Sequence, residues 1–114
     1  VLVVEDEESV RSVVVALLRD EGYDVEEAAD GVEALRVFEE NPDQFGMVLT
    51  DIMMPNMGGI DLARCLRRMR PALPIVFTTG YTVSPTELQD ECVLAKPYEI
   101  AQLFNVLEGL RAQP

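Results

Sequence analysis

The 114-residue chain contains no histidine and no tryptophan, and it has only two cysteines. The absence of histidine excludes Ser-His-Asp and Cys-His catalysis, zinc sites of the H-E-x-x-H type and any role as a phosphohistidine donor. Cys65 and Cys92 lie in apolar stretches and lack the C-x-x-C spacing of a redox pair. We therefore expect both to be reduced and buried like small hydrophobic residues.

Basic residues are also scarce, because nine Lys and Arg stand against 21 Asp and Glu, a formal net charge of -12. Such a charge repels nucleic-acid phosphates and anionic lipid surfaces, so we expect no direct nucleic-acid binding and favour the binding of a cation. No apolar run is long enough to span a bilayer, and no segment resembles a signal peptide. This predicts a cytoplasmic protein without membrane insertion.

The length of the chain and its 48% of hydrophobic residues fit one globular domain with its own core. We therefore expect a single domain over residues 1–114, without repeats, linkers or low-complexity segments. Because Val1 would be the first residue of a strand, we also expect further residues before it in the full polypeptide.

Short apolar runs alternate with segments of helical periodicity along the chain. The runs predict strands at residues 1–4, 23–29, 47–51, 75–79 and 93–95. The other segments predict four or five amphipathic helices. Their expected buried stripes contain Val10, Val13, Val14, Leu17, Leu18, Leu35, Phe38, Leu62, Cys65, Leu66, Met69, Ile100, Leu103, Phe104, Leu107 and Leu110. With right-handed crossovers, this alternation predicts an α/β fold, a doubly wound parallel sheet with helices on both faces.

Polar side chains stand where the expected strands end. Glu5 and Asp6 follow the first strand, and Asp51, Thr79 and Lys96 stand at the ends of the third, fourth and fifth strands. Because the carboxyl ends of parallel strands open into one crevice, we expect these side chains to lie close together. Taken singly, each acidic group could merely begin a helix, but the combination favours a site.

This set of residues suits phosphoryl transfer. Carboxylates that converge in a crevice repel one another, and Mg²⁺ relieves that repulsion when it binds a partial carboxylate set with waters and a phosphate oxygen. Lys96 can pair with a phosphoryl group added to Asp51, and the hydroxyl of Thr79 can donate to one of its oxygens. Since carboxylates form aspartyl-phosphate intermediates, Asp51 is the candidate acceptor.

The chain resembles the receiver domains of two-component response regulators over essentially its whole length. The resemblance rests on Val-Leu-Val-Val-Glu5-Asp6-Glu, Asp51-x-x-Met54-Pro55-x-Met57-x-Gly59, Thr79-Gly80 and Lys96-Pro97. It implies a flavodoxin-like five-stranded sheet of order 2-1-3-4-5. The run from Phe77 to Tyr81 is similar to receivers that stand alone or belong to hybrid histidine kinases.

The resemblance also implies roles for single residues. A histidine kinase or histidine phosphotransfer protein would phosphorylate Asp51, and Lys96 and Thr79 would contact the phosphoryl group. Mg²⁺ or Mn²⁺ would be held by Asp6, Asp51, the backbone carbonyl of Met53 and, through water, Glu5. Such a domain promotes its own phosphorylation and dephosphorylation and regulates a partner or attached domain, so it is a signalling device more than an enzyme.

Met53 stands two residues beyond Asp51, and Tyr81 stands two residues beyond Thr79. In the family that the chain resembles, these two positions border the path of the attacking water. Both are bulky, so we expect slow loss of the phosphoryl group. The family often has an aromatic switch residue three positions before the lysine, and here that residue is Val93. Coupling of Thr79 to a rotating ring is therefore not expected.

The segment 82–91 is shorter than the family pattern. A helix rises about 1.5 Å per residue, so there is room for two turns at most, with Leu88 as the apolar anchor. We expect a short fourth helix capped by Ser84, above-average mobility, and ordering on phosphorylation. The Lys96-Pro97 bond is expected to be cis from the resemblance.

Two other functions stay open at this point. A phosphohydrolase of the haloacid dehalogenase type also uses an Asp at a strand end, but it needs a second Asp two residues on, where this chain has Met53. A pseudo-receiver would only bind a partner, and the intact acidic set with Lys96 argues against it. Four arginines between Arg64 and Arg70 form either a solvated helix face, which we favour, or a docking patch. The oligomeric state and the output are not indicated.

Overall fold

The computed structural model describes residues 1–80, 91–96 and 98–111. The strands in this part of the chain are β1 Leu2–Val4, β2 Glu26–Ala28, β3 Val48–Asp51, β4 Ile75–Thr79 and β5 Cys92–Ala95. The helices are α1 Glu8–Asp20, α2 Gly31–Glu40, α3 Gly59–Met69 and α4 Ile100–Arg111. From β1 to β4 strands and helices alternate as the sequence pattern predicts, and α4 follows β5.

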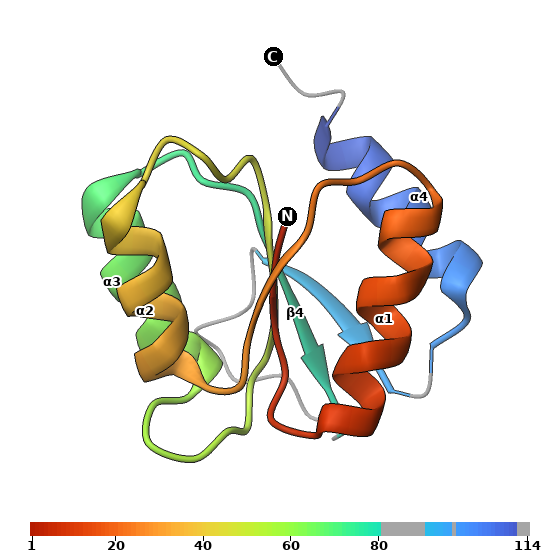
Figure 1. Cartoon of the computed structure of the whole chain (residues 1–114), viewed down its shortest axis with the longest axis horizontal. Coiled ribbons are helices and arrows are strands. Elements are labelled where there is room, and N and C mark those ends of the chain that lie inside the picture. Colours follow the sequence, from red (N-terminus) through yellow and green to blue (C-terminus); the bar gives the residue numbers. More distant parts are fainter. Residues whose placement is uncertain (81–90, 97, 112–114) are drawn as a thin grey trace.

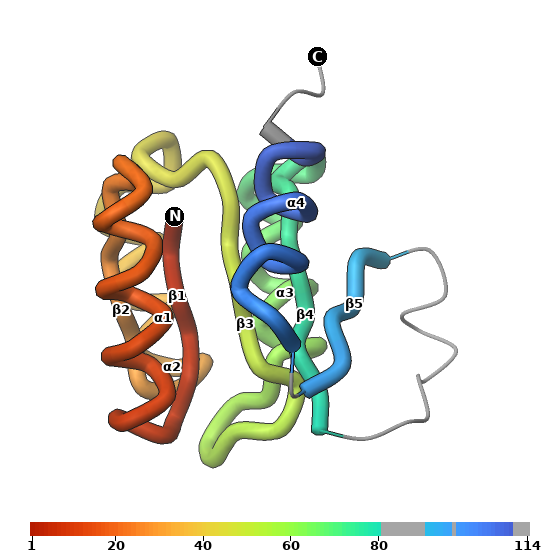
Figure 2. The backbone as a smooth tube through the Cα atoms, turned by 90° about the vertical axis from the view of Figure 1, so that its right-hand side faces the viewer, coloured from red at the N-terminus to blue at the C-terminus, as the bar shows by residue number. Residues whose placement is uncertain are grey.

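All strand pairs are parallel, and the order across the sheet is β2-β1-β3-β4-β5 (Figure 2). Helices α2 and α3 cover one face, and α1 and α4 cover the other (Figure 1). This confirms the predicted doubly wound α/β fold and its strand order. The edge strand β2 is shorter than the predicted 23–29, because β1 offers it only three partner residues.

Successive strand residues point to opposite faces and so supply two cores. Leu2, Val4, Val48, Ile75 and Phe77 pack with residues of α2 and α3 such as Phe38 and Leu66. Val3, Leu49 and Val76 pack with residues of α1 and α4 such as Leu18 and Leu103. The central strands are thus buried on both faces, which explains why their sequences are almost entirely apolar.

The buried stripe of α1 differs from the predicted one. Val14, Val15 and Leu18 are buried, whereas Val13 and Leu17 are 58% and 37% exposed. The cause is the apolar run from position 13 to 18, which covers nearly two turns and therefore fits more than one helix face.

Four further predictions about side chains are wrong. Met69 is exposed and Cys65 is only half-buried. Cys92 is exposed, because β5 lies at the edge of the sheet. Arg70 does not simply face water: it donates from Nη1 to the backbone oxygens of Phe45 and, at 3.1 Å, Pro42.

Arg67 likewise has a structural role, since it donates to the backbone oxygen of Leu73 at 3.4 Å and pairs with Glu91. Tyr81, the expected short helix up to residue 90 with its cap Ser84, and the bond to Pro97 lie outside the described residues. In the part of the chain that the structure describes, no helix has both the length and the apolar character needed to cross a membrane.

Candidate functional site

The sheet brings the predicted polar residues to one edge. Glu5 follows β1, and its backbone N–H donates to the carbonyl of Ala28 at 3.1 Å, which extends the pairing of β1 and β2. Asp51 is the last residue of β3. The backbone N–H of Lys96 donates to the carbonyl of Thr79 at 2.7 Å and so extends the pairing of β4 and β5. Sheet register therefore sets where these residues begin to project into the crevice.

Lys96 joins two of the carboxylates directly. Its Nζ lies 2.7 Å from Oε1 of Glu5 and 3.1 Å from Oδ2 of Asp51. The side chains of Glu5 and Asp51 are only 8% and 12% exposed, and that of Lys96 is 27% exposed. Because water screens these contacts poorly, the attraction between the Lys96 ammonium and the two carboxylates is stronger than in an exposed ion pair.

Burial and charge act in opposite directions on the two ends of this network. Burial raises the pKa of Glu5, and the neighbouring Asp51 raises it further, while the hydrogen bond from Lys96 opposes the shift. Burial alone would lower the pKa of Lys96, but its bonds to Glu5 and Asp51 outweigh that effect and the pKa is raised. Lys96 is therefore held as a cation between the two acids.

Asp6 completes an acidic cluster with these two residues. One carboxylate oxygen from each of Glu5, Asp6 and Asp51 lies within 4.8 Å of the others. Asp6 is exposed, and its backbone N–H donates to Oε2 of Glu5 at 3.0 Å. Oxygen donors at this spacing fit a hard divalent cation, and Mg²⁺ prefers such a site with room for water.

The loop after Asp51 is tightly built. A Cβ at Gly59 would lie 2.2 Å from the carbonyl oxygen of Asp51, so only glycine allows this close approach. Asn56 has φ +68° and donates from Nδ2 to Oδ2 of Asp30 at 2.8 Å. The other carboxylate oxygen of Asp30 accepts from the backbone N–H of Glu33 at 2.9 Å. Asp30 therefore caps α2 and, at the same time, holds the loop after Asp51 through Asn56.

The hydrogen bonds at Asp30 hold the pKa of that carboxyl below its usual value, the bond from the Glu33 backbone having the largest effect. A second link joins the same elements, because the Gly31 backbone N–H donates to the carbonyl of Met57 at 3.3 Å. Met53 lies in this loop and is 61% exposed. Its backbone carbonyl therefore belongs to a segment that is fixed at several points.

The comparison with protein families agrees with this geometry. Residues 1–108 match the family model described as the response regulator receiver domain. The chain belongs to this family. Receiver domains interact with histidine kinases or phosphotransfer proteins in two-component signalling, and they bind Mg²⁺ at an acidic pocket.

The chain is similar to two kinds of protein, a sensor kinase and a response regulator receiver protein. Sensor kinase CckA of Brucella abortus (strain 2308) is 46% identical over 116 residues, covering 96% of this chain and 12% of the kinase. Response regulator receiver protein CpdR of the same strain is 36% identical over 115 residues, covering 96% of this chain and 94% of CpdR. The chain thus spans a small part of the first relative and nearly all of the second.

A solved receiver shows the same fold. The crystal structure of response regulator protein TrrA from Thermotoga maritima, in complex with Mg²⁺-BeF, has a TM-score of 0.86 and 28% identity. The alignment covers 96% of each chain. The strands and helices described for the present chain are therefore arranged as in the crystal structure of TrrA.

Sequence reasoning did not single out Arg11, which contacts the site from α1. Its Nη1 donates to the backbone oxygen of Glu5 at 2.8 Å, and its Nε donates to Oε1 of Glu27 at 3.0 Å. One signal could have found it: a cation in the first half of a helix opposes the helix dipole, so a specific partner is expected there.

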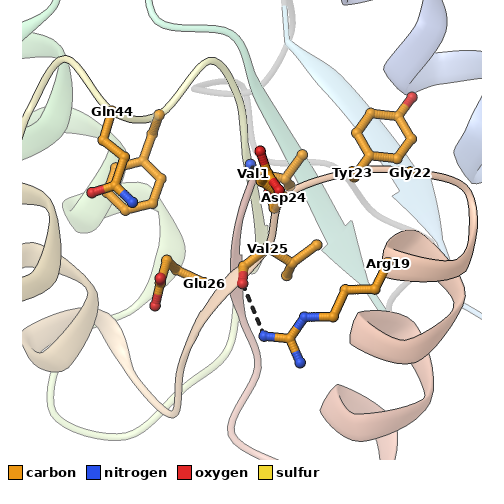
Figure 3. Close-up of a pocket in the computed structure, with 9 residues that line it drawn as sticks. Val1, Arg19, Gly22, Tyr23, Asp24, Val25, Glu26 and Gln44 are labelled. Carbon is orange, nitrogen blue, oxygen red and sulfur yellow. Dashed lines mark hydrogen bonds between the residues drawn. The ribbon is translucent and has the colours of Figure 1, made fainter.

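The receiver also has hollows outside the acidic cluster. One of about 590 Å³ is lined by residues that precede β1, β2 and β3, among them Val1, Asp24 and Gln44 (Figure 3). Arg19 closes one side and donates to the backbone oxygen of Val25 at 2.9 Å. Since these residues stand at the amino ends of the strands, the hollow lies away from the acidic cluster at the carboxyl ends.

Proposed function

We propose that this receiver accepts a phosphoryl group on Asp51 from a histidine kinase or histidine phosphotransfer protein, and that the change regulates a partner or attached domain. The observation that carries the proposal is the contact of Lys96 with Asp51 and Glu5 at the carboxyl edge of the sheet. This contact supports a role for Asp51 as an acceptor whose carboxylate is held in place by Lys96. We treat residues 1–114 as one receiver domain in this proposal.

In the proposed reaction, an Asp51 carboxylate oxygen attacks the phosphorus of a phosphohistidine. A P–O bond forms to Asp51 while the P–N bond breaks, and its electron pair returns to the imidazole nitrogen, which can then take up a proton from solvent. Lys96 is placed to pair with the transferred group, and Thr79 ends the adjacent strand as a hydroxyl donor.

The acidic cluster fits the metal that the family implies. Glu5, Asp6 and Asp51, with the backbone carbonyl of Met53, would hold Mg²⁺ or Mn²⁺. The bound ion would offset the negative charge that accumulates as the phosphoryl group is transferred. Lys96 itself holds the Asp51 carboxylate in place through its contact at 3.1 Å.

An apolar groove beside the site supports the approach of a protein partner. It is lined by exposed residues of α1, including Val13 and Leu17, and it continues to Lys96, Tyr98 and Ile100, with a volume of about 540 Å³. A donor histidine has to come close to Asp51, and this groove offers apolar surface next to that position.

The proposed conformational change does not use an aromatic switch. Val93 lies on β5 opposite Phe77 and packs, half-buried, against the core that the sheet forms with α2 and α3. A valine has no ring to rotate into or out of the core, so we propose that signalling from Thr79 passes through the segment between β4 and β5. Met53 and Tyr81 are proposed to border the path of the hydrolytic water.

The acceptor assignment is tested with a small phosphodonor. Acetyl phosphate with Mg²⁺ should add one phosphoryl group to the protein, measured by intact mass, because the carboxylate is positioned and the metal offsets charge. Asp51→Asn should abolish this addition. Asp61→Asn, on the exposed face of α3, is the matched control and should leave it unchanged. Phosphorylation that persists in Asp51→Asn would contradict the proposal. Partner affinity that is unchanged by Asp51→Asn would favour a pseudo-receiver.

A further inference from the structure

Arg11 joins three elements around the acidic turn. It is the fourth residue of α1, and its side chain is 15% exposed. One guanidinium nitrogen donates to the backbone oxygen of Glu5 at 2.8 Å, and another donates to Glu27 on β2 at 3.0 Å. The planar guanidinium is suited to two such contacts at once, which a lysine ammonium cannot reproduce with the same geometry.

The peptide unit between Glu5 and Asp6 is therefore held on both sides. Its carbonyl accepts from Arg11 at 2.8 Å, and its N–H donates to the Glu5 carboxylate at 3.0 Å. Because a peptide unit is planar, fixing its carbonyl and its N–H fixes the plane. That plane is one of the two peptide planes that meet at each Cα, so it restricts the directions in which the Glu5 and Asp6 side chains leave the backbone.

We propose that Arg11 is a positioning residue for the cation site: by fixing this peptide plane it pre-orients the carboxylates of Glu5 and Asp6. The inference rests on the proposed function, since the cation is the one that phosphoryl transfer uses. Arg11 would act indirectly: in the described contacts it binds the backbone oxygen of Glu5 and the carboxylate of Glu27, and neither Asp51 nor the carboxylates of Glu5 and Asp6.

Positioning and charge predict opposite effects of removing Arg11. A positive charge near an acidic cluster repels a divalent cation, so a role through charge alone predicts tighter Mg²⁺ binding in Arg11→Ala. A positioning role predicts weaker binding, because loss of a group that orients ligands typically reduces metal affinity about tenfold or more. The sign of the change therefore separates the two roles.

The experiment measures the Mg²⁺ affinity of the unphosphorylated protein by isothermal titration calorimetry at constant ionic strength. We expect about tenfold weaker binding in Arg11→Ala and a smaller loss in Arg11→Lys, which keeps the charge without the two-nitrogen geometry. Arg64→Ala removes the same charge from the exposed face of α3 and serves as the matched control. The Mg²⁺ affinity of Arg64→Ala should not fall below that of the wild type.

A second readout follows phosphorylation by acetyl phosphate as Mg²⁺ is raised. The Mg²⁺ concentration that gives half the maximal rate should rise about tenfold in Arg11→Ala, in step with the affinity, while the rate at saturating Mg²⁺ changes less. Should Arg11→Ala fail to fold, Arg11→Lys carries the same test.

Two failures can be told apart. If the wild type binds Mg²⁺ and is phosphorylated, but Arg11→Lys and Arg11→Ala bind Mg²⁺ as tightly as the wild type or more tightly, the role of Arg11 is overturned alone. If the wild type neither binds Mg²⁺ nor takes up a phosphoryl group, the proposed function is overturned, and the positioning role with it.

Discussion

Lys96 lies between two carboxylates that would otherwise repel each other. Its bonds to Glu5 and Asp51 offset part of the negative charge of the site before any cation is present. The raised pKa of Glu5 has burial as its largest cause, which shows how costly an isolated charge would be at this position. In the proposed function, a divalent cation can take over this compensation and leave Lys96 available to the phosphoryl group.

Met53 tests how a single side chain controls the lifetime of the phosphorylated state. It is 61% exposed in the loop that follows Asp51, and in the proposed function its bulky apolar side chain hinders the attacking water. We expect Met53→Asn to shorten the half-life of phosphorylated Asp51 severalfold, because a smaller, polar side chain admits and orients water.

The half-life is measured by intact mass after removal of acetyl phosphate. Met69→Asn makes the same substitution at an exposed position at the end of α3 and should leave the half-life unchanged. A half-life that is equal or longer in Met53→Asn would rule out this role.

The segment between β3 and α3 shows how an element is fixed by close backbone contacts. Gly59 begins α3 directly against the carbonyl oxygen of Asp51, and the α2 terminus approaches the same loop at Gly31, where a Cβ would lie 2.5 Å from the Met57 oxygen. The first residues of α2 and α3 and the end of β3 thus form one packed unit. Substitutions here act on the site through the backbone.

Gly59→Ala should therefore be destabilising. Its added Cβ would overlap backbone atoms of Asp51, which cannot move without disturbing β3, so we expect a loss of about 1–3 kcal/mol in the free energy of unfolding. Gly109→Ala is the matched control, because it lies within α4 with nothing within 4 Å of an added Cβ. It should stabilise by roughly 0.5–1 kcal/mol.

Urea denaturation of both variants provides the measurement. Equal stability of Gly59→Ala and the wild type would mean that the β3–α3 contact relaxes freely, contrary to the packing described here.

At the scale of the whole molecule, the net charge of -12 favours cations of any kind. Monovalent salt screens the repulsion between acidic groups spread over the surface. A divalent cation that binds the acidic cluster only in the folded state would add a specific contribution to the free energy of unfolding. The two effects can be separated by comparing salts at equal ionic strength.

We expect MgCl₂ to raise the Tm more than NaCl at the same ionic strength. Each tenfold increase in free Mg²⁺ above its Kd should add about 1.4 kcal/mol to the free energy of unfolding. Asp6→Asn should remove most of this specific part and keep the response to NaCl, since Asp6 belongs to the cluster. Thermal denaturation measures both. Equal responses to the two salts in the wild type would exclude a specific cation site.

Local patterns in the sequence predicted much of this molecule because they reflect local physics. Continuous apolar runs predicted strands buried on both faces, and polar residues after those runs predicted which side chains stand at the carboxyl edge. The same reasoning was wrong for Val13 and Leu17, because a continuous apolar run on a helix fits several faces. It was also wrong for Cys92, because exposure at a sheet edge depends on neighbours in space.

By itself, then, the sequence determined the fold class, the order of elements and the set of polar residues at the strand ends, all of which depend on composition and spacing along the chain. Only the tertiary structure decided that Lys96 contacts both Glu5 and Asp51, that Asn56 binds Asp30, and that Arg11 holds the Glu5 carbonyl. These contacts depend on distances and directions between side chains from different elements, which spacing along a chain does not specify.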